Sequence, residues 1–184
     1  MTGDFRKHFD SLAALALGEL LPGEQAAITY SAERTDFMRF NNCAVRQSGS
    51  VDQVEIGLKL WRGPKTFQSQ LTLSGNEDED AGRLAAALSE ARAMLPLLPD
   101  DPYQAIPAAA DSSDDRYAGS LLPLADIPAR VLGPAAGMYF TGLYSQGQVC
   151  RGAAKSAGAR HWFPTETILV DSSARLPKGS ALKS

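Results

Sequence analysis

The sequence predicts an α+β fold in which antiparallel β meanders are flanked by two helices. Apolar residues repeat at helical spacing near the beginning of the chain and again after residue 76. Between and after these segments, long stretches alternate between apolar and polar residues, which is typical of strands with one buried face. With 184 residues, of which 44% are hydrophobic and 21% charged, the chain can bury a core beneath such a sheet.

Both helices are predicted from an apolar stripe and from the residues at their ends. The first should end at residues 21–23, Leu-Pro-Gly, because proline cannot continue a helix. The second should begin after Asn76, whose side chain can cap the exposed amides, with the acidic residues 77–80 at the positive end of the helix dipole. The two stripes are Phe5, Phe9, Leu12, Ala16 and Leu20, and Leu84, Leu88, Ala91, Leu95 and Leu98.

Strands are expected between the two helices. Residues 28–32 alternate with polar neighbours, and 37–45 are rich in aromatic and apolar residues. The clearest strand covers 54–60, where apolar residues occupy every second position. A turn at 62–65, Arg-Gly-Pro-Lys, should lead into a returning strand over 67–73. These segments predict a meander.

Composition divides the chain into three parts. Residues 1–98 form the helix–meander–helix unit, and 99–136 form a connecting segment rich in Pro, Ala and Asp with no sustained period. A short helix over 126–136 is compatible with this segment, although its prolines weaken the pattern. Residues 137–184 return to a β meander, because apolar and polar residues alternate again.

Two glycines are expected to mark tight turns in the last meander. Gly147 should lead into a strand over 149–154, and Gly158 should precede a long strand beginning near His161.

Charge and hydropathy exclude several classes of function. The formal net charge is -3 and the sequence pI about 5.4. No cluster of Lys and Arg is longer than a pair, so no nucleic-acid partner is expected. No apolar run approaches the roughly 20 residues of a membrane span, and the first residues do not resemble a secretory signal. We therefore expect a cytoplasmic protein without a membrane partner, with Cys43 and Cys150 as reduced thiols.

The residues indicate no metal site in this chain. Zinc needs three or four converging ligands, whereas His8 and His161 stand alone and no HExxH or HExxxH helix occurs. The carboxylates at 77–80 are explained by helix capping and those at 114–115 by a solvated loop.

His161 is the candidate general base, since His8 lies close to the amino terminus. The interpretation that we favour is a structural histidine in a strand beside Trp162. A catalytic histidine also needs a positioned nucleophile and an orienting group, and no GxSxG motif supplies the nucleophile.

The stretch 34–49 interleaves arginines and amides with aromatic residues. On a strand, Arg39, Asn41, Arg46 and Gln47 could bind an extended peptide or line a subunit contact. An edge strand with a polar face explains the pattern equally well.

This stretch also resembles a known family. Residues 31–42, Ser-Ala-Glu-Arg-Thr-Asp-Phe-Met-Arg-Phe-Asn-Asn, and 45–49, Val-Arg-Gln-Ser-Gly, resemble the opening motif of the TldD/PmbA family. Residues 98–103, Leu-Pro-Asp-Asp-Pro-Tyr, are similar to a segment that follows the family's second helix. Residues 142–147 and 154–162 resemble its later meander. The matches occur in order and cover most of the chain.

The resemblance implies the α+β amino-terminal domain of the TldD/PmbA type, which a carboxy-terminal domain of comparable size follows in the family. Membership of this family would imply a cytoplasmic metallopeptidase assembly that degrades or trims unfolded peptides. Some family members are described as modulators of DNA gyrase. One subunit type bears an HExxxH motif that holds zinc. Its partner, the PmbA/TldE type, lacks the motif and helps enclose the chamber, and the motifs of this chain are closer to that type.

The resemblance therefore implies a non-catalytic part of such a peptidase, which would supply chamber wall and subunit contacts. It implies no catalytic residue, metal ligand or cofactor in this chain. Zinc would belong to a metal-bearing TldD-type partner subunit, and the other expected partners are the missing carboxy-terminal half and an unfolded peptide substrate.

The sequence departs from the family at two places. Residues 171–173 are Asp-Ser-Ser where Asp-Trp-Ser is expected, and the chain ends at Ser184 where the family continues. We expect an excised piece, a split gene product or a degraded relative. A stand-alone interaction or regulatory module without enzymatic activity is the alternative, and a small hydrolase using His161 is a third hypothesis.

Overall fold

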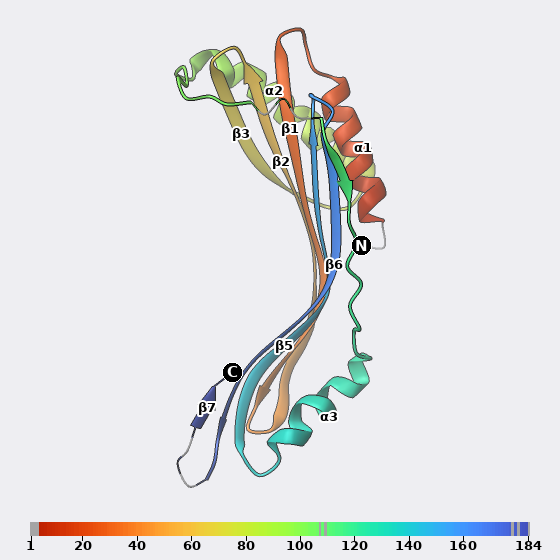
Figure 1. Ribbon diagram of the computed structural model, residues 1–184, viewed down its shortest axis with the longest axis vertical. Coiled ribbons are helices and arrows are strands. Elements are labelled where there is room, and N and C mark those ends of the chain that lie inside the picture. Colours follow the sequence, from red (N-terminus) through yellow and green to blue (C-terminus); the bar gives the residue numbers. More distant parts are fainter. Residues whose placement is uncertain (1–3, 107, 109, 178, 180, 184) are drawn as a thin grey trace. The chain divides into compact units, whose positions relative to one another are not determined.

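The computed structural model describes residues 4–106, 108, 110–177, 179 and 181–183. It is an α+β structure, as predicted (Figure 1). The helices are α1 (Phe5–Gly18), α2 (Glu77–Met94) and α3 (Ile127–Leu132), with short 3-10 turns η1 (Leu95–Leu97), η2 (Leu124–Asp126) and η3 (Gly133–Ala135). The strands are β1 (Glu24–Asn41), β2 (Ala44–Arg62), β3 (Lys65–Leu73), β4 (Ser112–Asp114), β5 (Tyr139–Lys155), β6 (Arg160–Arg175) and β7 (Ala181–Lys183).

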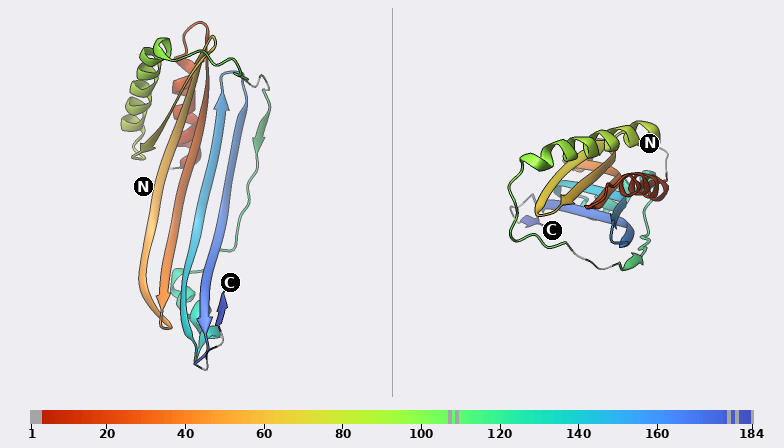
Figure 2. Two further views of the ribbon diagram at one scale, coloured as in Figure 1. Left: turned by 90° about the vertical axis from the view of Figure 1, so that its left-hand side faces the viewer. Right: turned by 90° about the horizontal axis from the view of Figure 1, so that it is seen from above.

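The strands form one 7-stranded sheet with the order β3-β2-β1-β5-β6-β4, and β7 also pairs with β6 (Figure 2). The β2–β3 hairpin is antiparallel and turns at Gly63, whose φ of 57° favours glycine, so the predicted turn is confirmed. The predicted turn at Gly158, with φ 100°, is also confirmed between β5 and β6.

One strand lies where the sequence predicted an irregular connecting segment. β4 covers only three residues and pairs parallel to β6, with Ser113 opposite His161. Three residues are too few for a period to emerge, and the pairing is set by a partner 48 positions away. The sequence therefore gave no local signal for this strand.

The chain divides into two compact units, which we describe separately. Unit 1 comprises Met1–Ala32, Gln53–Arg116 and Cys150–Pro164, and unit 2 comprises Glu33–Asp52, Tyr117–Val149 and Thr165–Ser184. The longest strands contribute residues to both units. The three-part division based on composition stays a prediction.

Unit 1 is built on the two predicted helices. The stripe of α1 is buried, and the ring of Phe9, which is 0% exposed, lies 5.6 Å from Tyr30 and 5.5 Å from Trp162. Gly152 allows this packing, because a Cβ there would lie 3.1 Å from the Phe9 ring. Aromatic burial therefore fixes α1 on the sheet.

The α2 helix begins as the sequence predicts, since the Asn76 side chain accepts a hydrogen bond from the Glu79 amide at 3.1 Å. Asp80 does more than favour the helix dipole. Its fully buried carboxylate accepts hydrogen bonds from the amides of Ser74 and Gly75, both at 2.7 Å, and lies 3.3 Å from Nε2 of His8. This carboxylate shapes the loop before α2 as well as its first turn.

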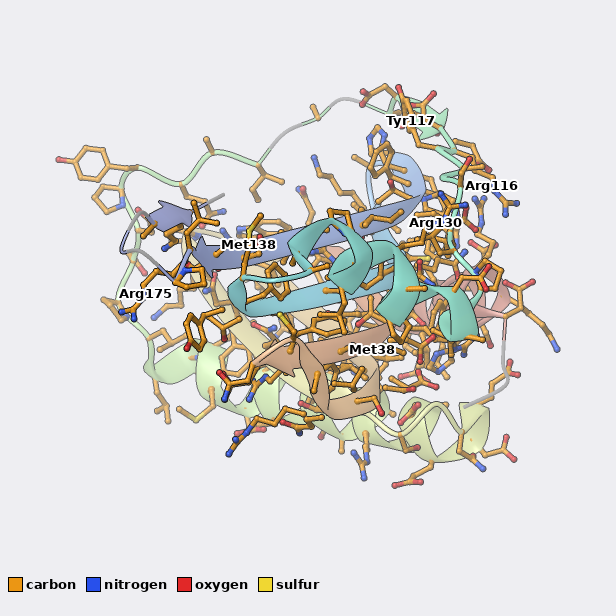
Figure 3. The ribbon with its side chains drawn as sticks, turned by 90° about the horizontal axis from the view of Figure 1, so that it is seen from below. Met38, Arg116, Tyr117, Arg130, Met138 and Arg175 are labelled. Carbon is orange, nitrogen blue, oxygen red and sulfur yellow. The ribbon has the colours of Figure 1, made fainter. Side chains whose placement is uncertain are left out.

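Unit 2 has its own smaller core. Phe40 and Phe140, with ring centroids 6.2 Å apart, pack with Tyr144 against Ile127 and Ala135. The short predicted helix is present as α3, and it covers this face of the sheet (Figure 3). Burial raises the pKa of the Tyr144 hydroxyl, which donates to Gln146 at 2.8 Å.

The prediction of a turn at Gly147 is wrong, because β5 runs through this residue without interruption. The glycine is required by a close approach between strands. A Cβ at Gly147 would lie 2.5 Å from Cα of Thr35. A glycine within an alternating pattern thus marked a tight backbone contact and not a chain reversal.

Candidate functional site

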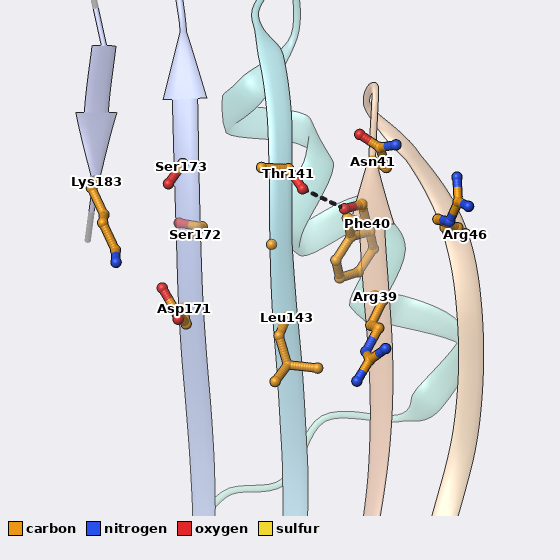
Figure 4. Close-up of a pocket in the computed structure, with 11 residues that line it drawn as sticks. Arg39, Phe40, Asn41, Arg46, Thr141, Leu143, Asp171, Ser172, Ser173 and Lys183 are labelled. Atoms are coloured by element: carbon orange, nitrogen blue, oxygen red, sulfur yellow. Dashed lines mark hydrogen bonds between the residues drawn. The ribbon is translucent and has the colours of Figure 1, made fainter.

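A polar groove of about 450 Å³ opens on the sheet of unit 2. It crosses five strands, β2, β1, β5, β6 and β7 (Figure 4). Its walls are formed by Arg39, Phe40, Asn41, Arg46, Thr141, Gly142, Leu143, Asp171, Ser172, Ser173 and Lys183.

The hairpin between β1 and β2 brings the arginines of this groove together. The stretch 34–49 is not one strand, because the chain reverses at Asn42 and Cys43, with φ values of 49° and 55°. Asparagine tolerates this left-handed conformation comparatively well. The reversal places Arg39 on β1 and Arg46 on β2, and both line the groove.

The interpretation of this stretch as an edge strand needs a corresponding correction. β1 lies inside the sheet, between β2 and β5. β2 pairs with β3 only from Val54 onward, so within the described residues its first part forms the edge.

Positive charge predominates in the groove. Arg39, Arg46 and Lys183 are exposed cations, and Asp171 is the single carboxylate among the lining residues. Within the described ranges no ion pair involves these four side chains, although the Arg39 guanidinium lies 6.0 Å from the centroid of the Phe37 ring. Unpaired cations beside a groove can bind ligand carboxylates or carbonyl oxygens.

Hydroxyl and amide groups supply the rest of the polar surface. The Thr141 hydroxyl donates to the carbonyl of Phe40 at 3.1 Å, which ties β5 to β1 at the groove floor. Asn41 and Ser173 add further donors and acceptors along the lining. Chemically, the arrangement can orient an extended polar ligand.

A second hollow, also of about 450 Å³, adjoins the groove and shares Asn41, Thr141 and Ser173 with it. It is more apolar, because Tyr139 and Phe140 contribute to its walls. The guanidinium of Arg175 lies 5.6 Å from the Tyr139 ring centroid, a cation–π geometry.

The structure brings together three of the five candidate site residues. Arg39, Asn41 and Arg46 line the groove, whereas Gln47 is exposed on β2 outside the lining. His161 belongs to unit 1 and is not part of the groove.

His161 bridges to the strand beside it. Its Nδ1 lies 3.0 Å from the Ser113 hydroxyl, and its Nε2 lies 3.9 Å from a carboxylate oxygen of Asp111. The second distance is too long for a hydrogen bond. Ser113 and Asp111 come from one short segment, so the contact with Ser113 helps to hold β4 against β6.

Sequence reasoning missed the groove residues on β5, β6 and β7. Residues 171–173 had drawn attention as a departure from the family motif, and they prove to line the groove. A usable signal was the strand alternation, which places Asp171 and Ser173 on one face. Which strand lies beside which was not readable from local patterns.

Within the described residues, no group of three or more His, Cys, Asp or Glu side chains is arranged to hold a metal ion. None of the helices in the described ranges has both the length and the apolar character that crossing a bilayer requires.

Comparison with known proteins identifies the fold. No family-level sequence profile matches the chain, and no curated protein is significantly similar to it in sequence. Among solved structures, a proposed modulator of a DNA gyrase from Thermotoga maritima superposes with a TM-score of 0.59 at 12% identity, over 98% of this chain and 42% of that chain. TldE from Thermococcus kodakarensis superposes with a TM-score of 0.55 at 9% identity, over 91% of this chain and 38% of that chain. A proposed DNA gyrase modulator from Bacteroides thetaiotaomicron superposes with a TM-score of 0.55 at 17% identity, over 95% of this chain and 41% of that chain.

These likenesses define the class of the protein as the fold of TldE and of the gyrase-modulator structures. The resemblance to the TldD/PmbA family is thereby confirmed at the level of fold. The chain spans about two-fifths of the length of each of these structures.

Proposed function

We propose that this chain is a non-catalytic component of a TldD/PmbA-like peptidase assembly, in which it supplies chamber wall and subunit contacts. The observation that carries the proposal is the likeness of fold to TldE over 91% of the chain. The polar groove supports it, since an extended peptide needs a surface rich in hydrogen-bonding groups and long enough to cross several strands.

The groove is the part of the chain that would face the peptide. Arg39 and Arg46 would bind carbonyl or carboxylate oxygens, and Asn41 would bind the peptide backbone. Peptide cleavage would take place on a metal-bearing TldD-type subunit, whose zinc activates water for hydrolysis. The setting that we propose is the cytoplasm, where unfolded peptides arise.

The test is affinity purification of the tagged chain from its native cytoplasm, followed by mass spectrometry. We expect recovery of a chain bearing HExxxH, and recovery of peptidase activity that a chelator removes. Recovery of no such chain by a well-folded bait contradicts the proposal and favours a stand-alone interaction module.

Substitutions separate the peptide-facing role from the subunit contacts. The double variant Arg39→Ala/Arg46→Ala should still recover the partner but should raise the KM for an unfolded peptide by about tenfold, the loss of roughly 1.4 kcal/mol of binding. Arg116→Ala is the matched control, because Arg116 is also an exposed arginine and lies outside the groove lining.

A further inference from the structure

The outer edge of β6 in unit 2 carries a short run of backbone without a neighbouring strand. On the amino-terminal side, the chain at Tyr117 pairs with β6 as far as Glu166, whose amide donates to the Tyr117 carbonyl at 3.0 Å. On the other side, β7 pairs with β6 from Ser173 onward (Figure 2). Residues 167–171 lie between these two pairings, and the described residues provide no strand on their outer side.

The direction of the backbone groups in this window follows from its two ends. The Glu166 amide points outward to Tyr117, and alternate residues of a strand point their N–H and C=O groups to the same side. The outward groups of the window are therefore those of Ile168 and Val170. Asp171 agrees with this assignment, because its carbonyl faces β5, where a Cβ on Gly142 would approach it to 2.9 Å.

The three central side chains of the window are apolar and exposed, and as neighbours along a strand they lie on both faces of the sheet. Ile168, Leu169 and Val170 are 46%, 57% and 49% exposed. Proteins usually protect an edge strand with Lys, Pro or a bulge, and these three residues offer no such protection. An added β-strand would pair with the backbone N–H and C=O groups of this edge and would cover the exposed apolar side chains beside them.

The length and charge of the window define its occupant. β6 continues as a strand beyond both ends of the window, so the β6 of a second copy would collide with the chain at Tyr117 or with β7. Only a short extended segment of about five residues fits, at roughly 3.3 Å for each residue. Acidic residues flank the apolar positions, with Glu166 directly before the window and Asp171 as its last residue. One carboxylate oxygen of Glu166 accepts a hydrogen bond from the Gly119 amide at 2.8 Å, and the group keeps its negative charge. Opposite charges stabilise cross-strand pairs.

We propose that residues 167–171 of β6 dock an extended segment of a partner polypeptide, with an apolar centre and Lys or Arg at its ends. The segment adds a strand whose backbone pairs with Ile168 and Val170. This inference goes beyond the proposed function, because it concerns the edge of the sheet and holds whether or not the groove binds peptide.

The test uses the whole chain and the synthetic five-residue peptide Lys-Val-Val-Val-Lys, with amide hydrogen exchange followed by NMR. In the free protein, the amides of Ile168 and Val170 should exchange faster than that of Leu169, which faces β5. Saturation with the peptide should slow the exchange of Ile168 and Val170 by about tenfold or more and leave Leu169 unchanged. The same peptide with proline at its central valine should have no effect, because proline removes a backbone donor.

A second measurement uses fluorescence anisotropy of the labelled peptide. The variant Ile168→Lys/Val170→Lys should weaken binding by about tenfold or more, since it places positive charge against the basic ends of the peptide. Because both side chains are half-exposed, the circular dichroism of the variant should match the wild type. Equal protection of all amides in 167–171, absence of binding up to about 1 mM peptide, or pairing of two copies through this edge would each overturn the proposal.

Discussion

Charged side chains are used differently in the two units. In unit 1, the carboxylates of Glu24 and Asp80 have 0% exposed side chains and are surrounded by donors. In unit 2, Arg39, Arg46 and Lys183 are exposed and line a groove without an ion pair among the described residues. Buried pairs make a fold sensitive to single substitutions, whereas exposed unpaired charges contribute little to stability and remain available to a ligand.

The hydrophobic cores of the two units also differ, and unit 1 has the larger one. The core of unit 1 joins both long helices to five strands, and the stacked rings of Phe9 and Trp162 belong to it. The core of unit 2 is smaller and is capped by the six-residue helix α3. This contrast teaches that unit 1 is the principal source of stability and that unit 2 presents the polar surface.

The largest effect is expected in the centre of unit 1. Phe9→Ala should lower the free energy of unfolding by about 3–5 kcal/mol, because it removes a fully buried ring and leaves a cavity beside Tyr30 and Trp162. Urea denaturation measures this change. A loss below about 1 kcal/mol would show that this aromatic packing does not hold α1 in place.

The buried carboxylate of Glu24 should give the next largest effect. Arg92 binds this carboxylate at 3.0 Å, and Arg62 binds it from β2. Glu24→Gln should therefore lower the free energy of unfolding by about 2–3 kcal/mol, measured by urea denaturation. The exposed Glu90→Gln is the control and should stay within about 0.5 kcal/mol of the wild type.

The same group predicts a pH dependence. Burial alone would raise the pKa of Glu24, but hydrogen bonds from Arg92, the Leu21 amide and Arg62 outweigh it and hold the pKa below the ordinary value of 4.5. The stabilisation is therefore fully present above pH 4.5 and is lost as the pH falls through the lowered pKa. Thermal unfolding of wild type and Glu24→Gln should converge at low pH. Parallel curves at all pH values would contradict this assignment.

An intermediate effect is expected within unit 2 at Gly147. Gly147→Ala forces β5 away from β1, because the new Cβ would lie 2.5 Å from Cα of Thr35, and the strain should cost about 1–3 kcal/mol. Gly82→Ala is the control, since nothing lies within 4 Å of its added Cβ and it lies inside the helix α2. This control should be neutral or stabilising by up to about 1 kcal/mol in thermal unfolding.

The smallest effect on stability is expected in the groove. Arg39→Ala/Arg46→Ala should change the free energy of unfolding by no more than about 0.5 kcal/mol, because neither arginine is buried or ion-paired within the described residues. A loss of several kcal/mol would show that the arginines hold the β1–β2 hairpin and would erase the contrast between the units.

Local patterns in the sequence carried much of the fold. The stripes predicted α1 and α2, Asn76 predicted the beginning of α2, and residues 62–65 predicted the turn between β2 and β3. These features depend on neighbours a few positions apart, so the sequence records them directly.

Contacts between distant residues escaped such patterns. Gly147 was mistaken for a turn because its requirement comes from β1, more than 100 positions earlier. Part of the groove could be predicted, since Arg39, Asn41 and Arg46 lie in one stretch of sequence. Asp171 and Lys183 line the same groove only because of the order of the strands in the sheet. Gln47 and His161 stay predictions as site residues, and the structure places both outside the groove.

The central claim is that the groove of unit 2 faces the peptide, and photo-crosslinking in the captured assembly tests it most directly. An unfolded peptide carrying benzophenone would be irradiated with the tagged chain and its partners, and the adducts would be mapped by mass spectrometry. The account predicts adducts within 39–46, 141–143 and 171–173, with fewer in Arg39→Ala/Arg46→Ala and no change in Arg116→Ala. Adducts confined to unit 1, or none on this chain while the partner is labelled, would contradict it.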